Sequence, residues 1–228
     1  MKHISIDTIA QSEAVSPKRT EPVQSFYSKA GKRAFDLTLA LLISPIVVPV
    51  ILVLWALTKL DGGPGFFGQV RVGKDKKYYK CWKIRTMRVD AEEVLTELCK
   101  SNPEIAREWN ENQKLKNDPR ITAVGRFMRA TSLDELPQFL NIVKGEMSFV
   151  GPRPFMAQQM QMYQTAGGRS YFEVRPGITG TWQVYGRGQT KFSDRVHYDD
   201  IYHNGLSFKQ DIGLIFKTVG VVLRATGT

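Results

Sequence analysis

The stretch LTLALLISPIVVPVILVLWAL, residues 37–57, contains no charged side chain over 21 positions. As one straight helix it would be about 31 Å long, which is enough to cross the hydrocarbon core of a bilayer. The alternative is a helix buried in a soluble domain, but such helices are rarely so long and so uniformly apolar. The stretch therefore predicts membrane insertion, and the rest of the architecture follows from it.

Basic residues flank this segment on both sides. Lys32 and Arg33 precede it and Lys59 follows it, with further basic residues beyond each end. A helix that spans the membrane normally shows a basic bias on one side only. The charge pattern therefore favours a segment whose two ends lie on the same, cytosolic face.

The middle of the segment is interrupted by Pro45 and Pro49. Each proline removes a backbone donor and bends a helix, and the hydroxyl of Ser44 can hydrogen-bond a carbonyl left free nearby. We expect a re-entrant helix that enters the membrane, bends and returns. A kinked helix that spans the membrane is the alternative.

Composition and organisation are those of one domain with an appendage. The chain has 228 residues, 42% of them hydrophobic, and a net charge of +10, which predicts an anionic partner. Nucleic acid, anionic lipid headgroups and phosphorylated substrates are all negatively charged, but no nucleic-acid-binding motif is present. Cys81 and Cys99 lack metal-type spacing and indicate reduced thiols. We expect a flexible tail over residues 1–31, the membrane helix over 32–60 and a compact domain over 61–228.

The predicted fold class is α+β and mainly helical. Aromatic and β-branched runs at Phe66–Val72 and Tyr78–Ile84, separated by a polar turn, predict a β-hairpin. Helices are predicted near residues 91–100, 103–114, 120–129, 155–165 and 207–223. In the last helix, apolar residues recur at helical spacing and predict core packing, with an interfacial role as the alternative. They are Phe208, Ile212, Ile215, Phe216 and Val219.

The sequence RATSLDELPQFLN, residues 129–141, carries the strongest candidates for chemistry, Asp134 and Glu135. Ser132 and Glu135 also fit a helix-capping box, which is a purely structural interpretation. A carboxylate near a helix N-terminus is favoured in its ionised form, and the same backbone donors favour a phosphate. Adjacent acids suit attack on phosphorus by one and cation binding by the other. They suit glycosidase chemistry poorly, because that needs carboxylates about 5–9.5 Å apart across a bond.

Three further segments supply positive charge. Arg153 lies between Pro152 and Pro154 in KGEMSFVGPRP, so a stiff loop presents a planar group that can hold a phosphate, although such arginines also occur in ordinary loops. Lys83 belongs to the basic segment KIRTMR, which could equally be a solvated face beside anionic lipid.

The third segment is RPGITGTWQVYGR, residues 175–187. Its glycines are expected to allow tight turns around Trp182 and Tyr185, with Arg175 at the start of the segment. Stacking on a base together with a phosphate contact is one interpretation, and a packed aromatic turn is the other. The residue types favour neither.

With these segments in hand, the chain resembles the monotopic phosphoglycosyl transferases, a family of bacterial sugar transferases, and within it the ExoY type. The likeness runs from Lys32 to about Thr218 and includes several motifs in the family's order. One departure is Gly65, where relatives often carry valine. The matching motifs are KRAFD, the Ser44-Pro45 break, KIRTM, RATSLDELPQFLN, GEMSFVGPRP and RPGITGTWQVYGR.

The resemblance implies roles for individual residues. Ser44 and Pro45 would form the break of the re-entrant helix, Asp134 would be the nucleophile, and Glu135 would bind Mg²⁺. The phosphate-contacting residues would be Lys83, Arg129, Arg153 and Arg175.

The resemblance also implies a reaction and a location. A sugar phosphate would pass from a UDP-sugar to undecaprenyl phosphate through a covalent aspartyl intermediate, which would initiate exopolysaccharide or glycoconjugate synthesis. Residues 61–228 would be the catalytic domain, on the cytosolic face of the bacterial inner membrane, with no role for nucleic acid. The alternatives are a membrane-tethered basic adapter protein and a metal-dependent nucleotide-sugar hydrolase.

Overall fold

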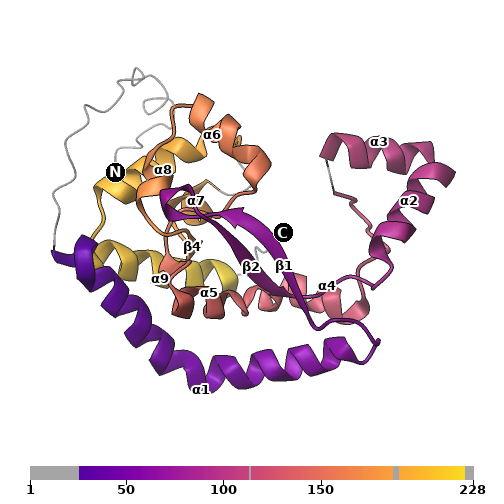
Figure 1. Cartoon of the computed structure of the whole chain (residues 1–228), viewed down its shortest axis with the longest axis horizontal. Coiled ribbons are helices and arrows are strands. Elements are labelled where there is room, and N and C mark those ends of the chain that lie inside the picture. Colours follow the sequence, from indigo (N-terminus) through magenta and orange to yellow (C-terminus); the bar gives the residue numbers. More distant parts are fainter. Residues whose placement is uncertain (1–25, 113, 187–189, 224–228) are drawn as a thin grey trace, which may run out of the picture.

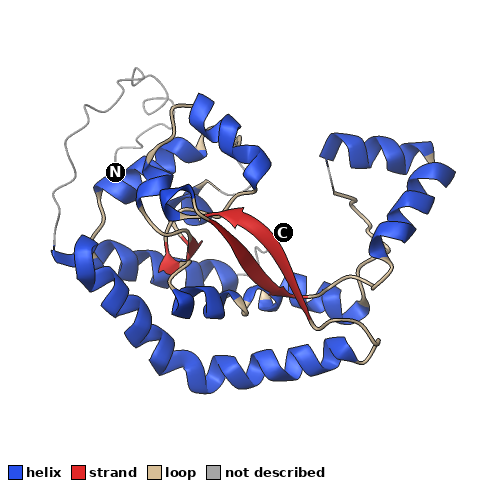
Figure 2. Ribbon diagram, viewed as in Figure 1, coloured by secondary structure: helices blue, strands red, loops and turns tan. Residues whose placement is uncertain are grey.

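The computed structural model describes residues 26–112, 114–186 and 190–223, and it is mainly helical with two small sheets (Figures 1 and 2). The predicted fold class is therefore confirmed. Most of the predicted tail, residues 1–25, lies outside the described residues, whereas Tyr27–Gly31 form a π-helical turn that continues into the first long helix. The elements are α1 (Lys32–Lys59), β1 (Phe66–Val72), β2 (Tyr78–Ile84), α2 (Ala91–Ser101), α3 (Pro103–Asn112), α4 (Ala123–Ala130), α5 (Gln138–Lys144), β3 (Ser148–Val150), α6 (Met160–Thr165), β4 (Gly177–Thr179), α7 (Thr181–Tyr185), α8 (Arg195–Asn204) and α9 (Phe208–Leu223).

Helix α1 bends but does not unwind at its prolines. Pro45 has no N–H to donate to the carbonyl of Leu41, four residues earlier, and the hydroxyl of Ser44 donates to that same carbonyl at 2.9 Å. The predicted compensation by Ser44 is thus confirmed. In Figure 1 the helix forms two arms that meet at an obtuse angle along the lower edge of the molecule.

The N-terminal end of α1 is fastened to the domain by buried charges. Asp36 is fully buried and accepts hydrogen bonds from the Ser148 hydroxyl at 2.9 Å and the Phe149 backbone N–H at 3.1 Å. The ammonium of Lys32 lies 2.8 Å from Oδ2 of Asp211 on α9. Arg33 donates to the carbonyls of Ile142 and Val143, so three residues of KRAFD dock the helix. The Asp211 carboxylate also accepts hydrogen bonds from the hydroxyls of Tyr27 and Tyr202.

The C-terminal end of α1 is fastened to the same domain. Arg85, which follows β2, donates to the carbonyl of Thr58 at 3.1 Å and to that of Pro64 at 2.6 Å, and it pairs with Asp61. Both ends of α1 therefore contact one domain, as a re-entrant helix requires. The course of this helix in a membrane stays a prediction.

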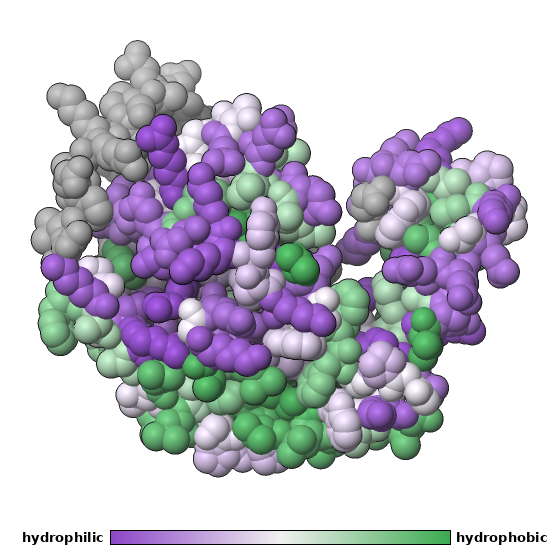
Figure 3. Space-filling model, in the orientation of Figure 1, coloured by the Kyte–Doolittle hydropathy of each residue, from purple (hydrophilic) through white to green (hydrophobic). Residues whose placement is uncertain are grey.

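The two faces of α1 differ in what they contact. One face packs through Ala40, Ile51 and Leu54 onto a core that includes Ile84 and Met128. The opposite face exposes large apolar side chains to the surroundings and forms the green lower band in Figure 3. The helix is long and apolar enough to cross a membrane, and a lipid phase would cover these side chains. The exposed residues include Leu41, Leu42, Ile46, Leu52 and Val53.

The predicted hairpin is confirmed with the expected bounds. Lys83 pairs with Phe67 and Tyr79 pairs with Arg71, so these four side chains share one face of the hairpin. A Cβ atom added to Gly65, just before β1, would lie 2.3 Å from Cδ1 of Trp55 on α1. Glycine at this position therefore makes room for the indole of the membrane helix.

Several helix boundaries differ from the prediction. The helix expected over residues 120–129 starts at Ala123, because the hydroxyl of Thr122 accepts a hydrogen bond from the Gly125 N–H at 2.9 Å and caps it. The helix expected from residue 155 starts at Met160, after a 3₁₀ turn. Helices α7 and α8 and the parallel pair of β3 with β4 were not predicted, since each lies in glycine-rich or polar sequence.

Candidate active site

Asp134 and Glu135 lie in a 3₁₀ turn, Leu133–Glu135, that leads into α5. The capping box considered for this segment is wrong. Ser132 has a left-handed backbone (φ 58°) and makes no side-chain cap, and the Glu135 carboxylate bonds Lys83 instead. A left-handed serine is unfavourable, and such strain gathers where a site must hold an unusual shape. The turn therefore serves to direct the two acids.

Lys83 on β2 brings the acids together with a cation. Its ammonium donates to Oε1 of Glu135 at 2.7 Å and lies 3.5 Å from Oδ2 of Asp134. Asp134 is buried, whereas Lys83 and Glu135 are partly exposed. One predicted phosphate-contacting residue thus sits directly between the two predicted catalytic acids.

The surroundings of Asp134 act on its pKa in opposite directions. Burial raises the pKa of this carboxyl and has the largest effect. The charge of Lys83 lowers the pKa, the neighbouring Glu135 raises it, and Arg129 lowers it, with a raised value as the result. The two cations therefore favour the ionised form that a nucleophile needs, within a pocket that resists ionisation.

Asn141 on α5 is a positioning residue that the sequence did not single out. Its fully buried side-chain amide accepts from the Trp82 N–H at 3.1 Å and donates to the Lys80 carbonyl at 2.8 Å. The amide thereby occupies the open edge of β2 as a neighbouring strand would, and it fixes Lys83 relative to the acid turn. The available signal was one amide inside the apolar run FLNIV.

Arg129, at the end of α4, is directed toward Asp134 by a contact between α4 and the chain after β2. Its Nε donates to the hydroxyl of Thr86 at 2.9 Å. Helix α4 can approach Thr86 this closely because Gly125 has no side chain. A Cβ atom there would lie 2.1 Å from the Thr86 carbonyl oxygen. The glycine therefore sets how closely Arg129 approaches the site.

Arg153 is presented by two interlocked backbone segments. Gly177 donates to the carbonyl of Pro152 and Gly151 donates to that of Thr179, both at 2.8 Å. A Cβ atom on Gly177 would lie 2.1 Å from the Gly151 nitrogen, so this glycine permits close approach of two backbones. The predicted tight turn is wrong for Gly177, which belongs to β4.

Arg175 lies elsewhere. Its Nε donates to the carbonyl of Gly145 at 2.8 Å, and the residue lines a cavity of about 430 Å³ together with Lys29 and His203. Within the described residues no hydrogen bond or ion pair connects Arg175 with Asp134 or Glu135. The structure thus groups Lys83 and Arg129 with the acids and places Arg175 apart from them.

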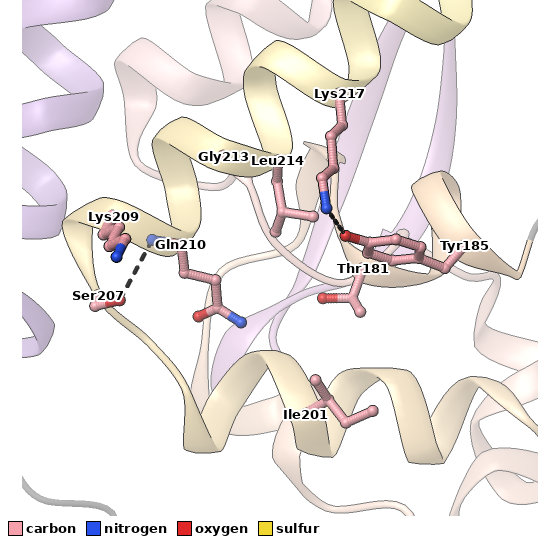
Figure 4. A pocket seen from close by; sticks show the side chains of 9 residues that line it. All are labelled: Thr181, Tyr185, Ile201, Ser207, Lys209, Gln210, Gly213, Leu214 and Lys217. Atoms are coloured by element: carbon pink, nitrogen blue, oxygen red, sulfur yellow. Dashed lines mark hydrogen bonds between the residues drawn. The ribbon is translucent and has the colours of Figure 1, made fainter. Parts of the chain in front are cut away.

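A second cavity of about 430 Å³ lies between α7, α8 and α9 (Figure 4). The side chains of Thr181, Gln210 and Lys217 border it, and the Lys217 ammonium donates to the hydroxyl of Tyr185. None of the predicted catalytic or phosphate-contacting residues lines this cavity. Tyr185 is thus a half-exposed residue that borders this cavity.

The donor set near the acids fits a magnesium ion that is shared with a substrate. Among the described residues, no group of three or more His, Cys, Asp and Glu side chains could hold a metal by itself. Magnesium is commonly held by one or two carboxylates and completes its shell with phosphate oxygens and water. Glu135, partly exposed beside Asp134, is a donor of that kind.

Comparison with known proteins identifies the family. The model of the family described as "Bacterial sugar transferase" matches residues 27–225. The chain belongs to this family. The sequence is 40% identical over 220 residues to the exopolysaccharide production protein ExoY of Rhizobium meliloti, with 96% of each chain covered. The predicted family is thus confirmed.

Longer relatives are also similar. The UDP-galactose-lipid carrier transferase of Erwinia amylovora is 47% identical over 201 residues, which are 88% of this chain and 42% of the relative. The undecaprenyl-phosphate galactose phosphotransferase of Salmonella typhimurium is 45% identical over 200 residues, again 88% and 42%. This chain therefore spans about two fifths of the length of these two proteins.

Proposed function

We propose that this sugar transferase moves a sugar phosphate from a UDP-sugar to undecaprenyl phosphate, in two steps linked by a covalent intermediate on Asp134. The observation that carries the proposal is the position of the Lys83 ammonium, 2.7 Å from Glu135 and 3.5 Å from Asp134. The names of the relatives from Salmonella typhimurium and Rhizobium meliloti support the lipid acceptor and a place in exopolysaccharide production.

In the first step an Oδ atom of Asp134 attacks the phosphorus that carries the sugar. A bond forms between the carboxylate and phosphorus, and the bond to the oxygen that bridges the two phosphates breaks. UMP leaves with that electron pair, and the sugar phosphate remains attached to Asp134. Both reactants are anions, so Lys83 and Arg129 are needed to offset their repulsion.

In the second step the phosphate of the lipid attacks the same phosphorus. The bond to the Asp134 carboxylate breaks, which restores the free acid and releases the undecaprenyl diphospho-sugar. Two successive steps allow one site to serve a soluble donor and a lipid acceptor in turn. Helix α1 supports this arrangement, since its apolar outer face would hold the domain at the depth of lipid headgroups.

Glu135, with Asp134 beside it, would hold Mg²⁺, which when bound supplies charge neutralisation on the diphosphate. In this scheme Lys83 keeps the two carboxylates close together before substrate enters. Lys83, Arg129 and Arg153 would orient the donor.

The test is detection of the covalent intermediate. Purified full-length protein is mixed with a UDP-sugar and Mg²⁺ without lipid, quenched and digested, and peptides are analysed by mass spectrometry. We expect a sugar-phosphate adduct on Asp134 and one equivalent of UMP. Absence of the adduct while lipid-linked product still forms would refute the covalent route.

The same assay separates the alternatives. A nucleotide-sugar hydrolase would release UMP over many turnovers without lipid, whereas the transferase stops after one. A membrane-tethered adapter protein would release none and would form no lipid-linked sugar.

A further inference from the structure

Arg195, the first residue of α8, is held between two aromatic rings. Its guanidinium carbon lies 4.1 Å from the ring centre of Trp182 and 4.8 Å from that of Phe192. Its Nε atom is buried and has no hydrogen-bond partner. A buried donor without an acceptor is costly, so an acceptor from outside the chain would satisfy it.

Two more arginines reach the same region. Arg71 lies on β1, where the next residue, Val72, donates its N–H to the carbonyl of Phe155 at 3.1 Å. That bond places the loop of Arg153 beside the end of β1. The Phe155 ring in turn lies 5.8 Å from the ring of Phe192, against which Arg195 packs.

The charges of these arginines are poorly compensated. The Arg71 guanidinium bonds the neutral amide of Gln69, and no ion pair among the described residues includes Arg71, Arg153 or Arg195. Burial and the charge of Arg153 lower the pKa of Arg195 to about 10, against the charge of the buried Asp199, which raises it, and burial and Arg153 also lower the pKa of Arg71. Three cations that repel each other in a partly buried place form a site prepared for an anion.

The position of the cluster relates it to the donor, because Arg71 lies on the same face of the hairpin as Lys83. Phe67 pairs with Lys83 across the hairpin, and Arg71 lies four residues after Phe67. This separation is about 13 Å along the strand. Lys74, in the turn at that end of the hairpin, borders the same cavity as Lys29 and Lys32 near the start of α1. The diphosphate of a donor bound at Asp134 can extend along this face toward Arg71, because Lys83 and Arg71 share it.

We propose that Arg71, Arg153 and Arg195 form the site for the nucleotide half of the donor and retain the nucleoside monophosphate product. The guanidiniums would contact its phosphate, and the ring of Trp182 would hold Arg195 in place. This inference rests on the proposed function, because it names where the donor's nucleotide lies. It adds Arg71 and Arg195 to the residues that bind substrate.

Binding of UMP to the full-length protein, measured by calorimetry, tests the site. We expect Arg71→Gln and Arg195→Gln each to weaken UMP binding about tenfold or more, since a hydrogen bond to a charged group is lost. Arg195→Lys keeps the charge but not the planar fork, and intermediate binding is expected. Arg169→Gln removes an equal charge from an exposed side chain and is the matched control, with unchanged binding.

Two further titrations test which phosphate compound the site binds. A short-chain polyprenyl phosphate and inorganic phosphate are titrated into the same proteins, whose folding is checked by thermal denaturation. An unchanged affinity for the polyprenyl phosphate supports the proposal, and so does a weak affinity for inorganic phosphate that falls in the variants.

Two results would overturn the site. One is an equal affinity for UMP in the wild type, Arg71→Gln and Arg195→Lys. The other is a loss of affinity for the polyprenyl phosphate in the variants as large as the loss for UMP. These failures are distinct from failure of the proposed function. If UMP binding depends on the arginines but no lipid-linked sugar ever forms, the function is wrong and the nucleotide site stands.

Discussion

The ammonium of Lys83 lies 3.5 Å from the carboxylate of Asp134, whose pKa burial raises and the lysine lowers. Only the ionised carboxylate can attack phosphorus. The rate of UMP release in a single turnover should therefore rise with pH through a pKa above the ordinary aspartate range and then level off. Replacing Lys83 by Met removes the charge that lowers this pKa, so the rise should shift to higher pH and the plateau should fall. A shift to lower pH would contradict the assignment.

Lys80→Met is the control for that experiment. The side chain of Lys80 is exposed and packs on Trp82, and only its backbone carbonyl serves the site. We expect its pH profile to match that of the wild type.

Asp134→Asn should separate catalysis from stability. The amide cannot form the acyl phosphate, so UMP release should fall at least about a thousandfold. Because folding raises the pKa of Asp134, its ionised form is disfavoured in the folded state, and this penalty is present at pH values above the folded pKa. The neutral amide removes the penalty, so Tm at neutral pH should be equal to or higher than that of the wild type. A large drop in Tm would indicate that the carboxylate is structural.

Gly125→Ala should disturb the site from a distance. The added methyl group would lie 2.1 Å from the backbone carbonyl oxygen of Thr86, so α4 must move and Arg129 with it. Overpacking of this kind typically costs about 1–3 kcal/mol, and we expect a matching drop in Tm together with reduced turnover. Gly213→Ala is the control, because a Cβ atom there meets nothing within 4 Å. Equal activity and stability of the two variants would show that the α4 contact is unimportant.

Helix α1 should keep both ends on one side even without its first proline. Single cysteines replace Lys29 and Leu60, which are exposed, in a Cys99→Ser background, and a membrane-impermeant thiol reagent is added to spheroplasts and to inverted vesicles. Both positions should be labelled in inverted vesicles only, and the same is expected with Pro45→Ala. The contacts at Asp211 and Thr58 hold the two ends in place regardless of the bend. Labelling of the two cysteines from opposite sides would refute the re-entrant topology.

The sequence was informative wherever local pattern determines structure. The 21 uncharged residues predicted one long apolar helix, and aromatic and β-branched runs around a polar turn predicted the hairpin to the residue. Ser44 was matched to the carbonyl that Pro45 leaves free, because the partners are three residues apart. In each case the residues that interact are close in sequence or repeat with the period of one element.

Contacts between distant segments could not be predicted in this way. Asn141 accepts a hydrogen bond from Trp82 on β2, 59 residues away in sequence, and the residue type alone does not indicate this partner. In α9 the apolar stripe predicted core packing, yet Phe216 and Val219 are exposed while Asp211 is fully buried. The buried face of that helix is decided by Lys32, Tyr27 and Tyr202, which hold the aspartate from other elements.

The buried network at Asp211 also constrains how the protein is made. Tyr27 and Asp211 are 184 positions apart, so at typical elongation rates the ribosome needs about 10–40 s to travel from one to the other. During that interval the newly inserted membrane segment has no Asp211, and among the described residues Lys32 pairs with Asp36, one helical turn away at 3.7 Å in the finished protein. Release of the last helix from the exit tunnel would then lock the anchor, which makes a nascent chain truncated before α9 the species most exposed to membrane proteases.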